Sequence, residues 1–159
     1  MKKILLSTVL FLFVVTAFCQ EQKNGTIYIK HPYIEVVNQA TRDYLADDFS
    51  KTSNYYADSA MWWISGMSKF VPLAEALKLW KGDFDKFDDI RQEPNGYPDF
   101  LHYIKDNSMI VQSWWTWSGK SKKTGEVTKV RMVMFDEFNV DGKITREYIF
   151  GDFSKLANE

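Results

Sequence analysis

Two ionisable side chains are the candidates for acid–base chemistry, His102 and Asp152. His102 falls in a short strand-like segment with Phe100 and Ile104 on its face, and a histidine changes its charge near neutral pH. Asp152 has the same strand parity as Arg146, so the two could supply a carboxylate and a cation. The ordinary alternatives are a hydrogen-bonded surface histidine and an ion pair at the rim of the fold.

Signatures of other chemistries are missing from the sequence. The two histidines, His31 and His102, lie far apart and have no carboxylates at ligand spacing beside them, so no metal site is predicted. The sequence also has no glycine-rich phosphate loop and no Gly-x-Ser-x-Gly nucleophile turn. We therefore expect no cofactor. A formal net charge of −1 argues against a nucleic-acid partner.

A second set of side chains could line an apolar binding site. Side chains alternate between the two faces of a strand, so every second residue shares a face. Aromatic and methionine residues in such rows usually pack a core, but six tryptophans are more than a small core usually requires. The rows are Ser113, Trp115 and Trp117; Val130, Met132 and Met134; and Arg146, Tyr148, Phe150 and Asp152.

Helices dominate the first half of the region that must position these residues. Apolar residues recur every three or four positions over 32–47, and a short helix is expected over 49–56. The clearest helix spans 73–87, where apolar residues follow at spacings of 4, 3, 4 and 3. A strand over 60–64 separates these helices, and a turn cluster over 92–98 ends the helical half.

The second half has the alternation of strands. The expected strands span 100–104, 109–119, 126–139 and 143–153, with Asp141-Gly142 as a tight turn before the last. Consecutive strands joined by hairpins form an antiparallel sheet. The order of helices, one strand, a helix and a meander predicts an α+β fold with the helices on one face of the sheet.

The N-terminus has the layout of a secretory signal. Two lysines precede an uncharged apolar run from Ile4 to Phe18, which is short for a membrane span. We expect cleavage after Cys19 and export to the periplasm or the medium; a lipid anchor on Cys19 is the alternative, although Phe18 fits that motif poorly. The expected organisation is a signal over 1–19, a short arm over 20–31 and a single domain over 32–156.

The order of elements, together with the segments YYADSAMWWISG and FNVDGKITREYIFGDF, resembles the nuclear transport factor 2-like superfamily. This superfamily includes the SnoaL-like polyketide cyclases and ketosteroid isomerase, and the resemblance covers about residues 33–153. It implies a cone-shaped, strongly curved antiparallel meander with about three helices packed on its concave face. It also implies a pocket for a small, often apolar molecule and, in many members, a homodimer.

The resemblance argues against the ketosteroid isomerase mechanism in this chain. It places Ile64 where those enzymes have their carboxylate base and Met134 where they have a protonated aspartate. Ala40 falls near their helix-one tyrosine. None of these three side chains can accept a proton or donate a hydrogen bond.

The resemblance also implies that the three rows of alternate strand residues listed above face the pocket. The opposite face of the sheet carries Trp114, Val133, Phe135 and Ile149 among charged residues, the mixed texture of a homodimer interface. The predicted pocket residues are Trp62, Ile64, Met67, Trp80, Trp115, Trp117, Met132, Met134, Tyr148 and Phe150.

Three functions are compatible with these observations, because a fold does not fix a function. The first is an exported protein that binds a small apolar or aromatic molecule in the cone. The second is a cofactor-free acid–base enzyme, an isomerase, cyclase or hydrolase, with His102 or Asp152 as proton carrier. The third is a dimeric interaction module whose cone is a filled core. The aromatic and methionine rows favour the first.

Overall fold

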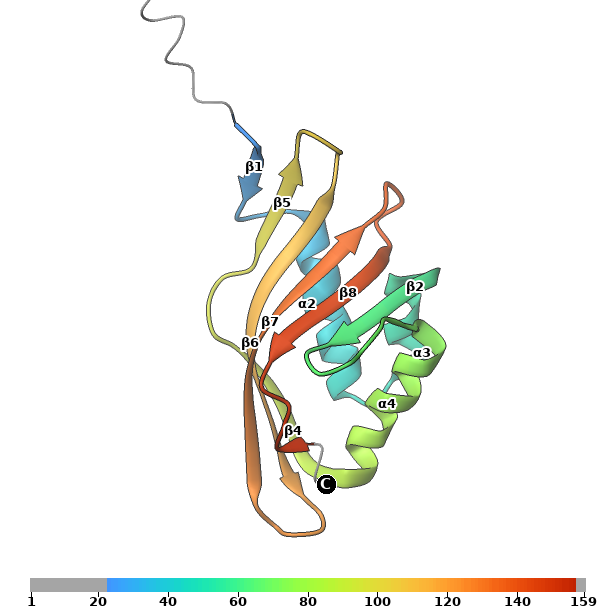
Figure 1. The fold of residues 1–159 in the computed structure, drawn as a ribbon, viewed down its shortest axis with the longest axis vertical. Coiled ribbons are helices and arrows are strands. Elements are labelled where there is room, and N and C mark those ends of the chain that lie inside the picture. Colours follow the sequence, from blue (N-terminus) through green and yellow to red (C-terminus); the bar gives the residue numbers. More distant parts are fainter. Residues whose placement is uncertain (1–22, 157–159) are drawn as a thin grey trace, which may run out of the picture.

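The computed structural model describes residues 23–156, which form an α+β fold (Figure 1). The predicted export signal and Cys19 lie outside the described residues. In chain order the elements are β1 (Gly25–Tyr28), α2 (Pro32–Leu45), α3 (Phe49–Thr52), the 3-10 turn η1 (Ser53–Tyr55), β2 (Tyr56–Ile64), β3 (Val71–Pro72), α4 (Leu73–Lys86), β4 (Phe87–Pro94), β5 (Asp99–Tyr103), β6 (Met109–Ser121), β7 (Val127–Phe138) and β8 (Ile144–Gly151).

The two long helices follow from local sequence signals. Pro32 opens α2, where its missing N–H costs no hydrogen bond, and the His31 ring nitrogen Nδ1 accepts a hydrogen bond from the Tyr33 amide at 3.2 Å. The helix buries Ile34 and Val37, as its periodicity predicts. Helix α4 buries Ala76 and Trp80 against the sheet. Both helices are confirmed close to their expected bounds.

An eight-stranded sheet has the order β1-β5-β6-β7-β8-β2-β3, and β4 pairs with β6 off this path. Strand β6 pairs along one edge with β7 and along the other with β5 and β4 in turn. The predicted antiparallel meander of β5 to β8 is confirmed. The sheet as a whole is mixed, because β2 pairs with β8 in parallel.

Three strands of the sheet differ from the sequence prediction. The expected arm over 20–31 contains β1, which pairs with β5, and β3 is a two-residue pair with β2. Strand β4 begins at Phe87, directly after α4 and with no loop between them. Phe87 happens to continue the helical spacing of apolar residues, so its prediction as the last residue of the helix is wrong. Strand β4 lies at an edge of the sheet and carries many charged residues, and Asp89 has a left-handed backbone with a φ of 53°. For these reasons its sequence does not show the alternation of apolar and polar residues that is typical of a strand.

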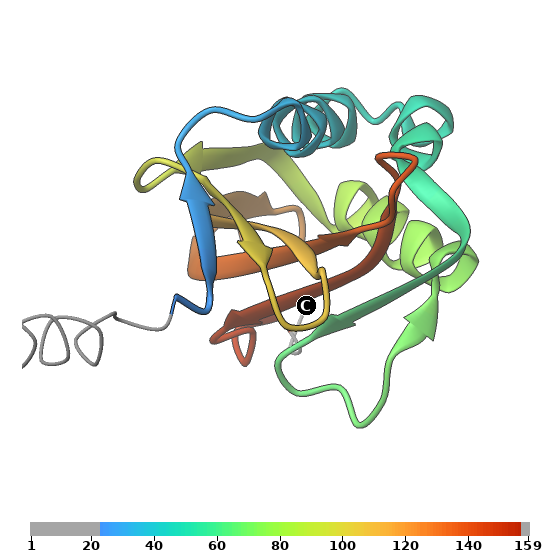
Figure 2. The ribbon, with the colours of Figure 1, turned by 90° about the horizontal axis from the view of Figure 1, so that it is seen from above.

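The helices lie along one side of the curved sheet (Figure 2). Buried residues between the two layers come from α2, β2, α4 and the strands. They include the aromatic rings of Trp62, Trp80, Phe100, Trp115 and Trp117. This arrangement confirms the predicted cone-like α+β class. No helix within residues 23–156 has the length and apolar character needed to cross a membrane.

Candidate functional site

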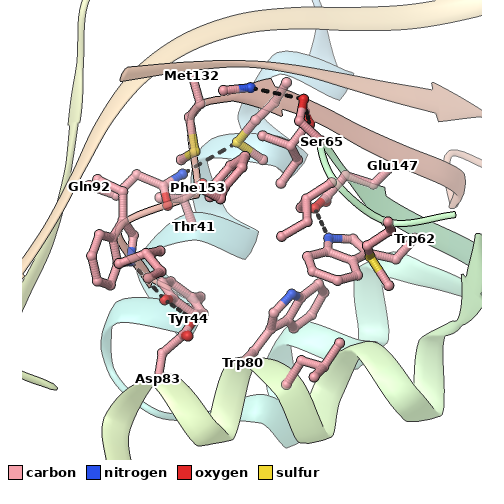
Figure 3. Close-up of a pocket in the computed structure, with 18 of the residues that line it drawn as sticks. Thr41, Tyr44, Trp62, Ser65, Trp80, Asp83, Gln92, Met132, Glu147 and Phe153 are labelled. Atoms are coloured by element: carbon pink, nitrogen blue, oxygen red, sulfur yellow. Dashed lines mark hydrogen bonds between the residues drawn. The ribbon is translucent and has the colours of Figure 1, made fainter. Parts of the chain in front are cut away.

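A cavity of about 830 Å³ lies between the helices and the sheet (Figure 3). Its wall is formed by residues of all three helices, of β2, β4, β6, β7 and β8, and of the segments that follow β2 and β8. Its volume is in the range of pockets that hold drug-sized molecules.

Most of the cavity wall is aromatic or sulfur-containing. The Trp62 and Trp80 rings meet edge to face with centroids 5.9 Å apart, and the Tyr56 ring lies 5.8 Å from Trp80. Met132 lies across the cavity from Trp80 (Figure 3), and Met134 accepts a hydrogen bond on its sulfur from the Gln92 amide at 3.5 Å. Such a wall favours flat, polarisable molecules.

The first polar group on the wall is a pair of buried carboxyls, Asp136 and Glu147, which are cross-strand partners on β7 and β8. The Trp62 indole N–H donates to Glu147 Oε1 at 2.8 Å, and the Tyr56 hydroxyl donates to Glu147 Oε2. Both oxygens of Asp136 are buried and have no hydrogen-bond partner among the described residues. The two carboxyls are therefore in different environments.

Burial raises the pKa of both carboxyl groups. For Asp136 the neighbouring Glu147 carboxylate adds to the effect, so its pKa lies well above the ordinary value. For Glu147 the hydrogen bonding of Tyr56, Asp136 and Trp62 opposes the rise. The donors to Glu147 therefore favour its charged form over that of Asp136.

The second polar group is a hydrogen-bonded chain on the opposite side of the cavity. The Trp117 indole N–H donates to the Tyr44 hydroxyl at 3.0 Å, and that hydroxyl donates to Asp83 Oδ2 at 3.0 Å (Figure 3). Burial raises the pKa of Asp83 to about 6, against the opposing effects of Tyr44 and Lys86. Asp83 is thus a carboxyl that titrates near neutral pH at the cavity wall.

Most of the predicted pocket residues lie on the cavity wall. The Asp152 carboxylate is at the exposed rim, where hydrogen bonding from Ser154 lowers its pKa. Arg146 pairs instead with Glu137, at 3.3 Å. The predicted residues on the wall are Trp62, Ile64, Met67, Trp80, Trp117, Met132, Met134 and Asp152.

Tyr148 and Phe150 face the other way, so their predicted inward orientation is wrong. Phe138 pairs with Ile144 but Glu137 pairs with Arg146, which leaves Thr145 as one extra residue in β8. Without this bulge Tyr148 would oppose Met134; with it, Ile149 does. The bulge exchanges the two faces of β8, and Ile149, predicted on the outer face, is buried.

Two more predicted residues lie away from the cavity wall. Trp115 is buried in the core, and its indole N–H donates to Ser113 of the same strand at 2.8 Å. His102 lies on β5, where its ring nitrogen Nε2 is 2.6 Å from the Asn107 side-chain oxygen. The structure therefore does not bring His102 and Asp152 together, and the interpretation of His102 as a hydrogen-bonded partly exposed residue fits its position.

The three carboxyl residues of the two polar groups were not predicted from the sequence. Asp136 continues the row Val130, Met132, Met134 by one step, so the alternation contained its signal. Asp83 follows Trp80 by three positions and therefore shares its helix face. Glu147 carried no usable signal because the bulge precedes it. Within residues 23–156 no group of three or more potential ligands is placed to hold a metal ion.

Comparison with known proteins connects this geometry to a family. The model of the SnoaL-like domain matches residues 33–147. No curated protein matches the sequence.

Solved structures share the fold at low sequence identity. AusH from Aspergillus nidulans has a TM-score of 0.63 at 12% identity, covering 77% of this chain and 86% of that one. An NTF2-like protein from Burkholderia thailandensis has a TM-score of 0.62 at 16% identity, covering 81% and 97%. A protein of ketosteroid isomerase-like fold from Catenulispora acidiphila, in complex with trimethylamine, has a TM-score of 0.58 at 12% identity, covering 76% and 85%.

Proposed function

Because the chain belongs to the SnoaL-like domain family of the nuclear transport factor 2-like superfamily, we propose that it binds a small, largely apolar or aromatic molecule in the cavity. The observation that carries this proposal is the cavity of about 830 Å³ with its tryptophan and methionine wall. A packed core leaves few voids larger than a water molecule, so a cavity of this size is unlike ordinary core packing. The complex of the Catenulispora acidiphila protein with trimethylamine adds a small organic molecule bound by a protein of this fold.

The test is a binding titration of the full chain with acetylnaphthalene, followed by tryptophan fluorescence. Trp80→Leu removes an aromatic wall at the cavity while keeping an apolar side chain, and we expect it to raise the dissociation constant about tenfold. Phe150→Leu is the matched control, because Phe150 is 46% exposed on the other face of the sheet. Thermal melts check that both variants fold. Equal affinities of the two folded variants would contradict the proposal, and so would a wild type that binds no apolar compound.

A second candidate function is a cofactor-free acid–base enzyme, and the observation that favours it is Asp83. A carboxyl with a pKa of about 6 at an apolar cavity wall is suited to take up a proton near neutral pH. Proton NMR in deuterium oxide would detect exchange of the methyl protons of bound acetylnaphthalene. If the enzyme reading is correct, exchange occurs in the wild type and is lost in Asp83→Asn, whereas binding persists in both.

The outer face of the sheet supports a homodimer as part of the same proposal. Five aromatic residues cluster there: Trp63, Phe70, Phe135, Tyr148 and Phe150. A self-complementary aromatic patch is a common basis of two-fold assembly.

Export remains a proposal that rests on residues 1–19 alone. The lysines and the apolar run of this segment are the features that a signal peptidase substrate requires. Mass spectrometry of the protein recovered from the envelope would give the cleavage site. A mass that matches a chain beginning at Gln20 supports export without an anchor. A mass that matches a chain beginning at Cys19 with an added lipid supports the anchored alternative.

A further inference from the structure

The buried part of the cavity wall carries acidic side chains and no basic one within residues 23–156. Asp136 and Glu147 are 1% and 3% exposed, and Asp83 is partly buried. The lysines of the wall, Lys78 and Lys86 of α4, are exposed at its rim, where water and salt screen their charge. Since a carboxyl is either neutral or negative, the interior favours a positively charged group over a negative one.

Asp83 is the acidic group of the interior that a ligand can reach. The Tyr44 hydroxyl donates to its Oδ2 at 3.0 Å, and its Oδ1 has no hydrogen-bond donor among the described residues. Unlike the oxygens of Asp136, Oδ1 of Asp83 is not sealed from solvent. Figure 3 shows the side chain extending from α4 toward Tyr44 at the cavity wall. One oxygen of Asp83 is therefore held by the protein, and the other is available to a ligand.

Aromatic rings cluster one helical turn before Asp83. Trp80 precedes Asp83 by three positions on α4, so the two side chains share a face of the helix. Around Trp80 lie the rings of Tyr44, Tyr56 and Trp62, with centroids 6.5, 5.8 and 5.9 Å from its own, and all four rings line the cavity. Aromatic rings attract an organic cation through their π electrons, most strongly where water is excluded. A carboxylate beside such rings is a combination suited to an ammonium group.

The groups packed around Asp83 favour its ionised form. Tyr44 of α2 and Lys86 of α4 are the titratable groups that act on it, and both oppose the rise in its pKa that burial causes, which ends at about 6. Strand β6 contributes Trp117, which is uncharged and donates to the Tyr44 hydroxyl. A cation beside Oδ1 would lower the pKa of Asp83 further, because an opposite charge stabilises the carboxylate.

Other classes of ligand use this wall less fully. A carboxylate ligand would meet acidic groups in the interior, and the lysines that could pair with it are exposed at the rim. A neutral molecule fills the apolar space but leaves the ionised Asp83 without a partner in a partly dry site, which is costly. An ammonium group with an apolar body satisfies both the carboxylate and the rings.

We propose that the cavity binds an organic ammonium ion with an apolar or aromatic body, whose nitrogen lies between the Asp83 carboxylate and the rings of Trp80 and Tyr44. An N–H group of the ammonium donates to Oδ1 of Asp83, and the apolar body fills the rest of the cavity. This inference rests on the proposed binding function and names the chemical class of its ligand.

The test compares two probes of the same shape on the full chain: aminomethylnaphthalene, which carries an ammonium group, and ethylnaphthalene, which carries a methyl group in its place. At pH 7.5 we expect the wild type to bind the amine about tenfold more tightly, because the attraction to Asp83 and the rings exceeds the cost of removing the ammonium group from water. Asp83→Asn keeps an oxygen acceptor for Tyr44 and should lose this preference, while it binds ethylnaphthalene as the wild type does.

Asp85→Asn is the matched control. Asp85 is an exposed residue of the same helix that does not line the cavity, so this variant removes the same charge from outside the site. It should keep the preference for the amine. Thermal melts check that both variants fold.

The preference should also depend on pH, because only the ionised carboxyl attracts the amine. A primary amine stays protonated between pH 5 and pH 7.5, so a change in its affinity over this range reports on the protein. Since the pKa of Asp83 is about 6, we expect the wild type to bind the amine about fivefold more weakly at pH 5 than at pH 7.5. Ethylnaphthalene should show no such change. This measurement needs only the wild type and decides the question even if Asp83→Asn does not fold.

Carbon NMR of protein labelled at the aspartate carboxyls follows the same coupling from the side of Asp83. The signal that is absent in Asp83→Asn should titrate about one pH unit lower when aminomethylnaphthalene is bound, which is the reciprocal of a tenfold preference. Ethylnaphthalene should not lower it.

The outcomes separate this inference from the proposed function. The ammonium proposal is overturned, while the binding function stands, if the wild type binds the two probes equally, if its affinity for the amine does not change with pH, or if folded Asp83→Asn keeps the preference. A loss of the preference in Asp85→Asn as well would show a general effect of charge and would also overturn it. If the wild type binds neither of these probes nor acetylnaphthalene, the proposed function is overturned and the ligand class with it.

Discussion

At the scale of single residues, Asp83 links the cavity to the pH dependence of stability. Burial raises its pKa in the folded protein from 3.8 to about 6. Between about pH 4 and pH 6 the folded state thus holds a proton that the unfolded state has released, and stability falls as the pH rises through this window. A shift of this size corresponds to a loss of up to about 3 kcal/mol that is complete above pH 6.

We expect Asp83→Asn to remove this loss, because the amide keeps an oxygen acceptor for the Tyr44 hydroxyl and carries no charge. Urea unfolding of the wild type and of Asp83→Asn at about pH 4 and pH 8 gives the free energy of unfolding of each protein at each pH. Relative to the wild type, the free energy of unfolding of the variant should rise by about 2 to 3 kcal/mol between the two pH values. Lys123→Gln serves as a control for general charge effects. A difference between Asp83→Asn and the wild type that does not change with pH would contradict the assignment.

The residues of the site were predictable only where a repeating pattern reaches them. The alternation that carries Met132 and Met134 extends to Asp136, and the face of Trp80 extends to Asp83, so both follow from the sequence once the patterns are continued. Glu147 was not predictable in this way. A single extra residue, Thr145, reverses the faces of β8, and nothing in the composition of that strand marks the bulge.

At the scale of elements, Gly119 lies near the end of β6, where its backbone packs closely against two aromatic side chains. A Cβ at Gly119 would lie 2.8 Å from the Trp117 ring and 3.0 Å from Phe87 Cβ. Those two rings are themselves packed edge to face with centroids 5.2 Å apart. The glycine therefore lets β4 pack closely against β6 immediately after α4.

We expect Gly119→Ala to lower the free energy of unfolding by about 1 to 3 kcal/mol, the usual effect of overpacking a core. Gly82→Ala is the matched control, since Gly82 lies inside α4 with no atom within 4 Å of an added Cβ. That change should raise stability by about 0.5 to 1 kcal/mol, because alanine favours the helix. Equilibrium urea unfolding measures both. If Gly119→Ala leaves the free energy of unfolding unchanged, the close packing at Gly119 is contradicted, whatever the size of the effect of Gly82→Ala.

The helices and strands that could be located from the sequence are those with a long, regular pattern of apolar residues. Helices α2 and α4 and strands β6 and β7 have long, regular patterns and were located from the sequence to within a few residues. Strand β4 was not, because it continues directly from a helix and carries charged residues on an edge. Strand β1 is short and largely exposed, so its few residues have no alternation to detect.

At the scale of the whole molecule, periodicity alone gives the α+β class but not the cone. The cone depends on the parallel pairing of β2 with β8, which joins segments about 85 residues apart and leaves no local signal. The resemblance to the superfamily implied a cone-shaped antiparallel sheet, and the parallel pair was not predicted. The cavity lies between the sheet and the helices, so its volume and its two polar groups appear only when the layers are assembled.

The outer face of the sheet has the composition of an interface. Phe135 stacks on Tyr148 with centroids 5.2 Å apart, and the Trp63 and Phe150 rings lie 5.3 Å apart. The Arg146 guanidinium lies 5.4 Å from the centre of the Phe70 ring. Aromatic residues with an arginine are the types enriched in the centre of protein interfaces.

We expect the full chain to have the mass of a dimer in size-exclusion chromatography with light scattering, and Phe150→Glu to have the mass of a monomer. The reason is that a glutamate in the aromatic cluster would have to lose its water on association without gaining a partner. Val140→Glu is the matched control, because Val140 is 78% exposed at the turn between β7 and β8 and should leave the dimer intact. Since the cavity is on the other face of the sheet, Phe150→Glu should still bind acetylnaphthalene. A wild-type monomer would show that the aromatic face does not mediate self-association, and a loss of binding in folded Phe150→Glu would show that the two faces are coupled.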